Sequence, residues 1–209
     1  CSLLNGEKEQ FTVIAVGPLT NLAQAESRSP GVLCSARELV IMGGAIRVAG
    51  NVTPTGEFNF VSDPEAARIV INSGARIRLV PLDATRQMLL TANQLRSSLR
   101  NAPEALRSTC EQLTRTAMNL RRMNQGQDGI YLHDPLTAML AVRPDLAEWE
   151  TLFIDIETRG ELTAGQVVTD ERPQQNRSGT PLSVAGRIDR DAVVAEFSRG
   201  FQGSQEATG

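Results

Sequence analysis

The chain has 209 residues, of which 41% are apolar and 22% are charged, a composition typical of one globular domain. Its formal net charge is -3 and its Lys and Arg residues are scattered, which argues against a surface for nucleic acid. No apolar run approaches the roughly 18 residues that a membrane span needs. The three cysteines lack the spacing of a disulfide framework or a zinc site. We therefore expect a cytoplasmic protein that binds a small polar molecule, not nucleic acid or a membrane.

Three short apolar runs predict strands, and the first two are closed by glycine. They lie at residues 11–16, 38–42 and 76–82 and are rich in β-branched and other aliphatic side chains. Such runs are typical of strands that are buried on both faces of a sheet. Because helical patterns separate them, we expect an open, mostly parallel α/β sheet with flanking helices. Ligands of such sheets bind at the carboxyl ends of the strands.

Capping residues mark the starts of the expected helices. Thr20 or Asn21 can cap a first helix, and Ser62 or Asp63 can cap a second over residues 64–71. After the third apolar run, residues 91–123 are mostly helical with a break near Pro103, and an apolar helix capped by His133 or Asp134 ends near Val142. Two strands of a hairpin are expected at 152–157 and 166–169. An irregular polar stretch at 173–183 and an amphipathic helix at 189–201 follow them.

A polar loop at residues 50–60 follows the second apolar run. It places two amides, Asn51 and Asn59, beside the carboxylate of Glu57, among several turn-forming residues. Amides both donate and accept hydrogen bonds, and a carboxylate accepts them strongly. The loop is therefore a candidate for gripping the hydroxyl groups of a sugar.

His133 and Asp134 form a second candidate, and His133 is the only histidine in the chain. A histidine can donate a proton to a departing heterocycle near neutral pH, and an adjacent aspartate can bind a hard cation such as calcium. The alternative is that Asp134 simply caps a helix beside a surface histidine. The two residues alone do not separate these interpretations.

Residues at the ends of the predicted strands offer further candidates. The carbonyl of Val16 could meet a cation, although a plain turn with a capping residue explains the same sequence. Gly43 and Gly44 could let the backbone approach a ligand closely. Asp83 and Thr85 are expected to cap the segment that follows them.

Six motifs together resemble the inosine-uridine preferring nucleoside hydrolase family, from about residue 11 to about residue 200. The motifs, in the family's order, are Gly17-Pro18-Leu19-Thr20-Asn21-Leu22-Ala23, Met42-Gly43-Gly44-Ala45, Gly50-Asn51 through Phe60, Asp63-Pro64-Glu65-Ala66-Ala67, Pro81-Leu82-Asp83 and His133-Asp134-Pro135.

The resemblance implies an open α/β fold and hydrolysis of the N-glycosidic bond of ribonucleosides to ribose and free base, assisted by calcium. It also implies a small-molecule nucleoside as the partner, and a homodimer or homotetramer. By resemblance, the site residues are Val16 and Asp134 as calcium ligands, Asn51 and Glu57 at the ribose 5′-hydroxyl, Asn59 at the 2′-hydroxyl, Met42 under the sugar, His133 as the acid, and Tyr131 either in the base pocket or in packing.

One departure from the family is large. The family's Asp-x-Asp-x-Gly-x-Asp-Asp motif, which supplies the general base and further calcium ligands, has no counterpart in the 209 residues. We therefore expect residues 1–209 to be a nucleoside hydrolase-like domain that is incomplete at its N-terminus, lacks the first strands and is inactive alone. The alternatives are a non-catalytic ribose- or nucleoside-binding domain and an inactive truncated product.

Overall fold

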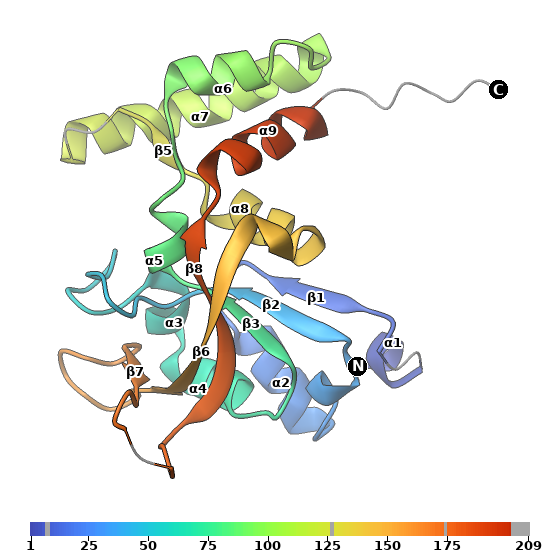
Figure 1. Ribbon diagram of the computed structural model, residues 1–209, viewed down its shortest axis with the longest axis vertical. Helices are drawn as coiled ribbons and strands as arrows, with labels where there is room; N and C mark the ends of the chain where they lie inside the picture. The colour runs from blue at the N-terminus through green and yellow to red at the C-terminus, as the bar shows by residue number, and fades with distance from the viewer. Residues whose placement is uncertain (7–8, 126–127, 174, 202–209) are drawn as a thin grey trace.

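The computed structural model describes residues 1–209 except 7–8, 126–127, 174 and 202–209 (Figure 1). The strands are β1 (Thr12–Ala15), β2 (Glu38–Met42), β3 (Ile77–Val80), β4 (Leu89–Leu90), β5 (Ile130–Tyr131), β6 (Ala147–Ile156), β7 (Val167–Thr169) and β8 (Thr180–Ile188). The α-helices are α1 (Ser2–Gly6), α2 (Thr20–Arg28), α3 (Phe58–Ser62), α4 (Pro64–Ile71), α5 (Leu82–Thr85), α6 (Ala92–Ser98), α7 (Glu104–Gln125), α8 (His133–Val142) and α9 (Arg190–Gly200).

The main sheet has six strands in the order β1-β2-β3-β8-β6-β7. β1, β2, β3 and β8 run parallel, with Val13 opposite Leu39 and Leu39 opposite Ile77, whereas β6 pairs antiparallel with both of its neighbours, β8 and β7. The predicted open α/β sheet with flanking helices is confirmed, and its antiparallel part makes it mixed. The carboxyl ends of β1, β2 and β3 meet at one edge of the sheet, as parallel strands require.

β8 contradicts the prediction of an irregular stretch at 173–183. From Thr180 the chain forms a strand between β3 and β6, and Leu182 and Val184 are buried in the core. Pro181 and Gly186 interrupt the apolar pattern and disguise the strand, because both are unfavourable inside strands. Pro181 precedes the residues that pair with β3, so its missing N–H removes no bond to that strand.

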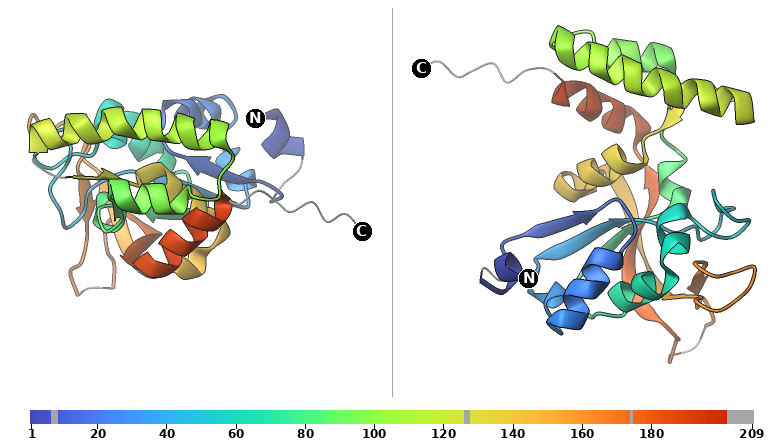
Figure 2. Two further views of the ribbon diagram at one scale, coloured as in Figure 1. Left: turned by 90° about the horizontal axis from the view of Figure 1, so that it is seen from above. Right: turned by 180° about the vertical axis from the view of Figure 1, so that it is seen from behind.

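The two faces of the parallel strands carry separate cores. Leu39 and Ile41 belong to a cluster with α2 and α4, whereas Val40 and Val80 belong to a cluster with α5 and α8. This alternation follows from the two-residue period of a strand. Figures 1 and 2 show α2 and α4 on one side of the sheet and α8 on the other, with α6, α7 and α9 stacked beyond α8.

The helix caps agree only in part with the sequence predictions. Asp63 caps α4 by accepting a hydrogen bond from the amide of Ala66 at 3.0 Å, as predicted. Thr20 and Asn21 are not caps, because α2 begins at Thr20, whose hydroxyl donates to the carboxylate of Asp63 instead. This bond ties the start of α2 to the start of α4.

The start of α8 also differs from the prediction. Leu132 occupies the N-cap position and its side chain makes no capping bond, so neither His133 nor Asp134 caps the helix. Both residues lie in the first turn of α8.

Arg78 of β3 fixes the other end of α8. Its guanidinium donates to the carboxylate of Glu38 at 2.7 and 2.8 Å, and to the carbonyl oxygens of Leu140 and Ala141 at 2.7 and 3.2 Å. A cation at the end of a helix satisfies its last carbonyls and interacts favourably with its dipole. The contact holds α8 against the sheet and so sets where its first turn lies.

No helix in the described ranges is both long enough and apolar enough to cross a membrane.

We expect Arg78→Met to lower the free energy of unfolding by about 3 kcal/mol or more, because it leaves the carboxylate of Glu38 without its partner in a largely buried place. Arg68→Met is the matched control: Arg68 makes a similar two-pronged pair with Asp155 on the surface, where water screens the charges, so its loss should cost much less. Urea unfolding of both variants measures the difference, and equal losses would contradict the role of Arg78.

Candidate active site

The carboxyl edge of the sheet brings several predicted residues together. Met42 ends β2 and is buried, and Asn59 of α3 is also buried. The Asn59 side-chain amide donates to the Met42 carbonyl oxygen at 3.0 Å and lies 3.4 Å from the Met42 sulfur. In the part of the chain that the structure describes, no group donates to the Asn59 side-chain oxygen.

Glu57 lies beside them and is 2% exposed. One carboxylate oxygen accepts from the amide of Asn59 at 2.9 Å, and the other accepts from the amides of Gly44 at 2.9 Å and Phe60 at 3.3 Å. Glu57 is therefore the N-cap of α3 and also joins that helix to the end of β2. The contact of Glu57 with a ribose hydroxyl stays a prediction. Its role as the N-cap of α3 was not predicted from the sequence.

The electrostatics of Glu57 link it to Asp134. Burial raises the pKa of Glu57, the three amide donors lower it, and the negative charge of Asp134 raises it. The net effect is a raised pKa, so the loss of hydration on burial has a larger effect on the carboxylate than the hydrogen bonds from the amides. The two carboxylates thus lie close enough to feel each other's charge, although Glu57 belongs to the β2–α3 connection and Asp134 to α8.

Asn51 lies on the exposed part of the same loop. Its side-chain oxygen accepts a hydrogen bond from the amide of Phe58 at 2.9 Å, at the start of α3. Its backbone amide donates to the carbonyl oxygen of Gly56, which closes the loop on itself. Asn51 thus contacts the residue next to Glu57.

Gly43 and Gly44 are required for packing. A Cβ atom on Gly43 would lie 2.3 Å from the ring of Phe60, and one on Gly44 would lie 2.6 Å from Val167. Gly44 also has φ of +80°, a conformation that other residues adopt rarely. The expected close approach is therefore made by protein side chains in this structure.

Arg86 is a functional candidate that the sequence analysis missed, and the role of Asp83 differs from the one expected. Asp83, expected to cap its own segment, instead accepts from the amides of Ile46 at 2.9 Å and Arg47 at 2.7 Å. Arg86 donates to the carbonyl oxygens of Ala49 at 2.7 Å and Gly50 at 2.8 Å. α5 and the residue after it thus hold the loop that leads to Asn51. No local signal reveals this, because the partners are 36 and 37 residues away along the chain.

His133 is held from the same short helix. Its Nδ1 atom lies 2.7 Å from the hydroxyl oxygen of Thr85, and its ring is tilted against that of Tyr131 with the centroids 5.5 Å apart. Thr85 was also expected to be a cap, and the structure places it against the imidazole instead. α5 therefore contacts both the loop that leads to Asn51 and the imidazole of His133.

Asp134 and Val16 offer oxygen atoms of the kind that calcium prefers. Partial burial raises the pKa of Asp134, although the residue keeps an exposed surface. Within the described ranges no backbone amide donates to the Val16 carbonyl, and no group of three or more His, Cys, Asp or Glu side chains could hold a metal ion. α8 packs against β1 and β2. Calcium takes 6–8 oxygen ligands, so these two fit the ion in chemistry and fall short in number.

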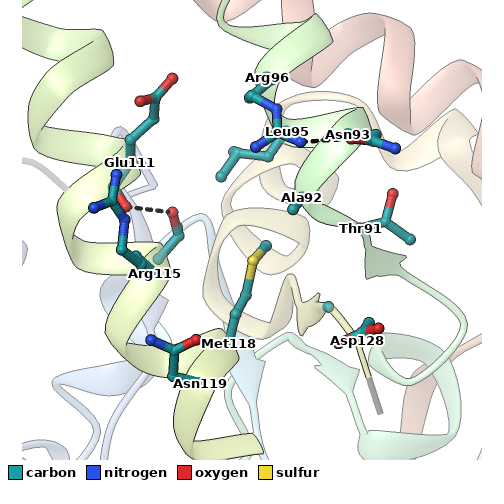
Figure 3. Close-up of a pocket in the computed structure, with 12 residues that line it drawn as sticks. Thr91, Ala92, Asn93, Leu95, Arg96, Glu111, Arg115, Met118, Asn119 and Asp128 are labelled. Carbon is teal, nitrogen blue, oxygen red and sulfur yellow. Dashed lines mark hydrogen bonds between the residues drawn. The ribbon is translucent and has the colours of Figure 1, made fainter. Parts of the chain in front are cut away.

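A separate cavity of about 400 Å³ lies between α6, α7 and β5 (Figure 3). Its wall includes Thr91 and Arg96 on one side and Arg115 and Met118 on the other. None of the predicted site residues lines it. The cavity is therefore distinct from the site at the carboxyl edge of the sheet.

Comparison with known proteins agrees with this geometry. The family model described as inosine-uridine preferring nucleoside hydrolase matches residues 1–195. The chain is 38% identical over 200 residues to the non-specific ribonucleoside hydrolase RihC of Escherichia coli, which covers 93% of this chain and 59% of that protein.

Solved structures give the same result. A plant nucleoside hydrolase, PpNRh1, superposes with a TM-score of 0.88 and 29% identity, covering 97% of this chain and 65% of the other. The purine-preferring ribonucleoside hydrolase from Gardnerella vaginalis superposes with a TM-score of 0.86 and 27% identity, covering 97% and 63%.

The chain spans between 54% and 59% of the length of the curated relatives that it matches first. The family model nevertheless covers most of the chain, and the relatives share both its sequence and its fold. The chain belongs to the inosine-uridine preferring nucleoside hydrolase family.

Proposed function

We propose that this chain is part of a longer protein that hydrolyses the N-glycosidic bond of ribonucleosides to ribose and free base. Membership of the family supports the reaction class. The chain's own contribution is the sugar site at the carboxyl edge of the sheet, with Asn51, Glu57, Asn59 and Met42 around the ribose. Cleavage builds positive charge on the sugar, which oriented oxygens stabilise.

One observation carries the proposal more than any other. The side-chain oxygen of Asn59 is an acceptor in a residue that is only 4% exposed, and no group in the described structure donates to it. A buried acceptor without a donor is costly, so such an atom is expected to meet a partner. A ribose hydroxyl is a donor of the right kind, and Glu57 and Met42 lie beside Asn59.

The proposal includes calcium, with Val16 and Asp134 supplying two of its ligands. When bound, the ion orients the attacking water and lowers its pKa. His133, one residue before Asp134, is proposed to donate to the departing base. The further ligands and the general base must then come from another part of the longer protein.

The proposal also covers the cellular compartment and the oligomeric state of the protein. All three cysteines are free, which favours a reducing compartment such as the cytoplasm. A homodimer or homotetramer is proposed from the family resemblance. The second candidate function is nucleoside binding without hydrolysis, and it is favoured by a sugar site that is better formed than the metal site.

We expect the longer protein to release base from inosine or uridine only with calcium present. Asp134→Asn and His133→Ala should each lower kcat by about 100-fold or more, because each removes a group worth about 3 kcal/mol in the transition state. Asp145→Asn is the matched control, since Asp145 is an exposed carboxylate just beyond the other end of α8 and should have little effect. Nucleoside binding without turnover in the longer protein would support the binding function instead.

The isolated chain of 209 residues should release no base, even in excess calcium. The reason is that the family's Asp-x-Asp-x-Gly-x-Asp-Asp motif, which supplies the general base, has no counterpart in its sequence. A sensitive assay for free hypoxanthine or uracil checks this, and measurable release by purified chain would place the general base within these residues.

Arg86→Met should raise the KM of the longer protein for nucleoside by about 10-fold and change kcat less. The substitution keeps the side-chain stem but removes two charge-assisted bonds to the loop that carries Asn51. Arg47→Met is the control, because Arg47 lies on the same loop and pairs with the exposed residues Glu150 and Glu171. Equal effects of the two variants would contradict a special role for Arg86.

A further inference from the structure

The hydroxyl of Thr85 lies 2.7 Å from Nδ1 of His133, between residues 48 positions apart in the chain. Thr85 is the last residue of α5 and is completely buried. The helix that carries it is fixed, because Asp83 and Arg86 on either side hold the β2–α3 loop by four hydrogen bonds. The hydroxyl therefore meets the imidazole from a rigid position.

The direction of this hydrogen bond follows from the surroundings of the hydroxyl. A buried hydroxyl has one hydrogen to donate and needs an acceptor for it. Among the described residues the only partner of the Thr85 hydroxyl is His133 Nδ1, whereas the equally buried Thr137 donates to the carbonyl oxygen of its own helix, that of His133, at 3.0 Å. The Thr85 hydrogen is thus directed at Nδ1, which accepts it.

We propose that Thr85 is a positioning residue that holds neutral His133 in the tautomer with its hydrogen on Nε2. The hydrogen bond that one ring nitrogen makes decides which nitrogen carries the hydrogen. Nδ1 accepts from Thr85, so Nε2 is the donor nitrogen. The role of Nε2 as the atom that donates to a departing base rests on the proposed function, whereas the tautomer does not.

The single histidine makes the test direct. The untagged chain, labelled with ¹⁵N, gives one pair of imidazole nitrogen signals, which a long-range ¹H–¹⁵N correlation spectrum assigns to Nδ1 and Nε2. Spectra are recorded in alkaline buffer so that the neutral ring is observed. A fixed tautomer gives two widely separated nitrogen shifts, and exchange between tautomers brings the shifts together.

We expect wild-type His133 to show widely separated shifts, with Nε2 as the protonated nitrogen. Thr85→Val should make the two shifts converge, and Thr85→Ser should restore their separation because it keeps the hydroxyl. Thr137→Val is the matched control: it removes another buried threonine hydroxyl that contacts His133 but leaves the ring bond intact, so the separation should persist.

Either of two results would overturn the proposal: a wild-type spectrum with the hydrogen on Nδ1, or a Thr85→Val spectrum that keeps the wild-type separation. The wild-type spectrum decides the question even if Thr85→Val does not fold. No result depends on nucleoside turnover, so a failure of the proposed function and a failure of this inference are distinguishable.

Discussion

The buried carboxylate of Glu57 is the interaction on which the rest of the candidate site depends. It accepts from the amides of Gly44, Asn59 and Phe60, and so joins the end of β2 to the first turn of α3. A carboxylate is buried at a cost that these bonds must offset. Because both of its oxygens are engaged, the backbone around Met42 and Asn59, where the candidate sugar site lies, is held in one arrangement.

α5 is the second organiser of the site. It follows β3 directly, and the side chains of Asp83, Thr85 and Arg86 all reach outward to groups on other segments. Asp83 and Arg86 hydrogen-bond to backbone groups of the loop between β2 and α3. Thr85 contacts the imidazole of His133. One turn of helix and the residue after it thereby set the relation between the loop that leads to Asn51 and the imidazole of His133.

Much of the fold could be predicted because its signals are local. β2 was predicted at its observed bounds, since a continuous apolar run ends abruptly at two glycines. The cap of α4 was narrowed to Ser62 or Asp63 because both residue types favour that position before a proline, and Asp63 is the one observed. β8 was missed because Pro181 and Gly186 break the pattern, and only its neighbours β3 and β6 make it a strand. In β8, hydrogen bonding to the neighbouring strands outweighs the low strand propensity of these residues.

By itself, the sequence determined the α/β alternation, the family, and which polar residues follow the strands. Tertiary structure alone decided how those residues are used. It showed that Asp134 does not cap α8, that Glu57 does cap α3, and that Asp83 and Thr85 bind partners 37 and 48 residues away. The physical reason is that a hydrogen bond forms between whichever donors and acceptors the packing of the chain brings close together. Sequence spacing predicts that only within a turn or a helix.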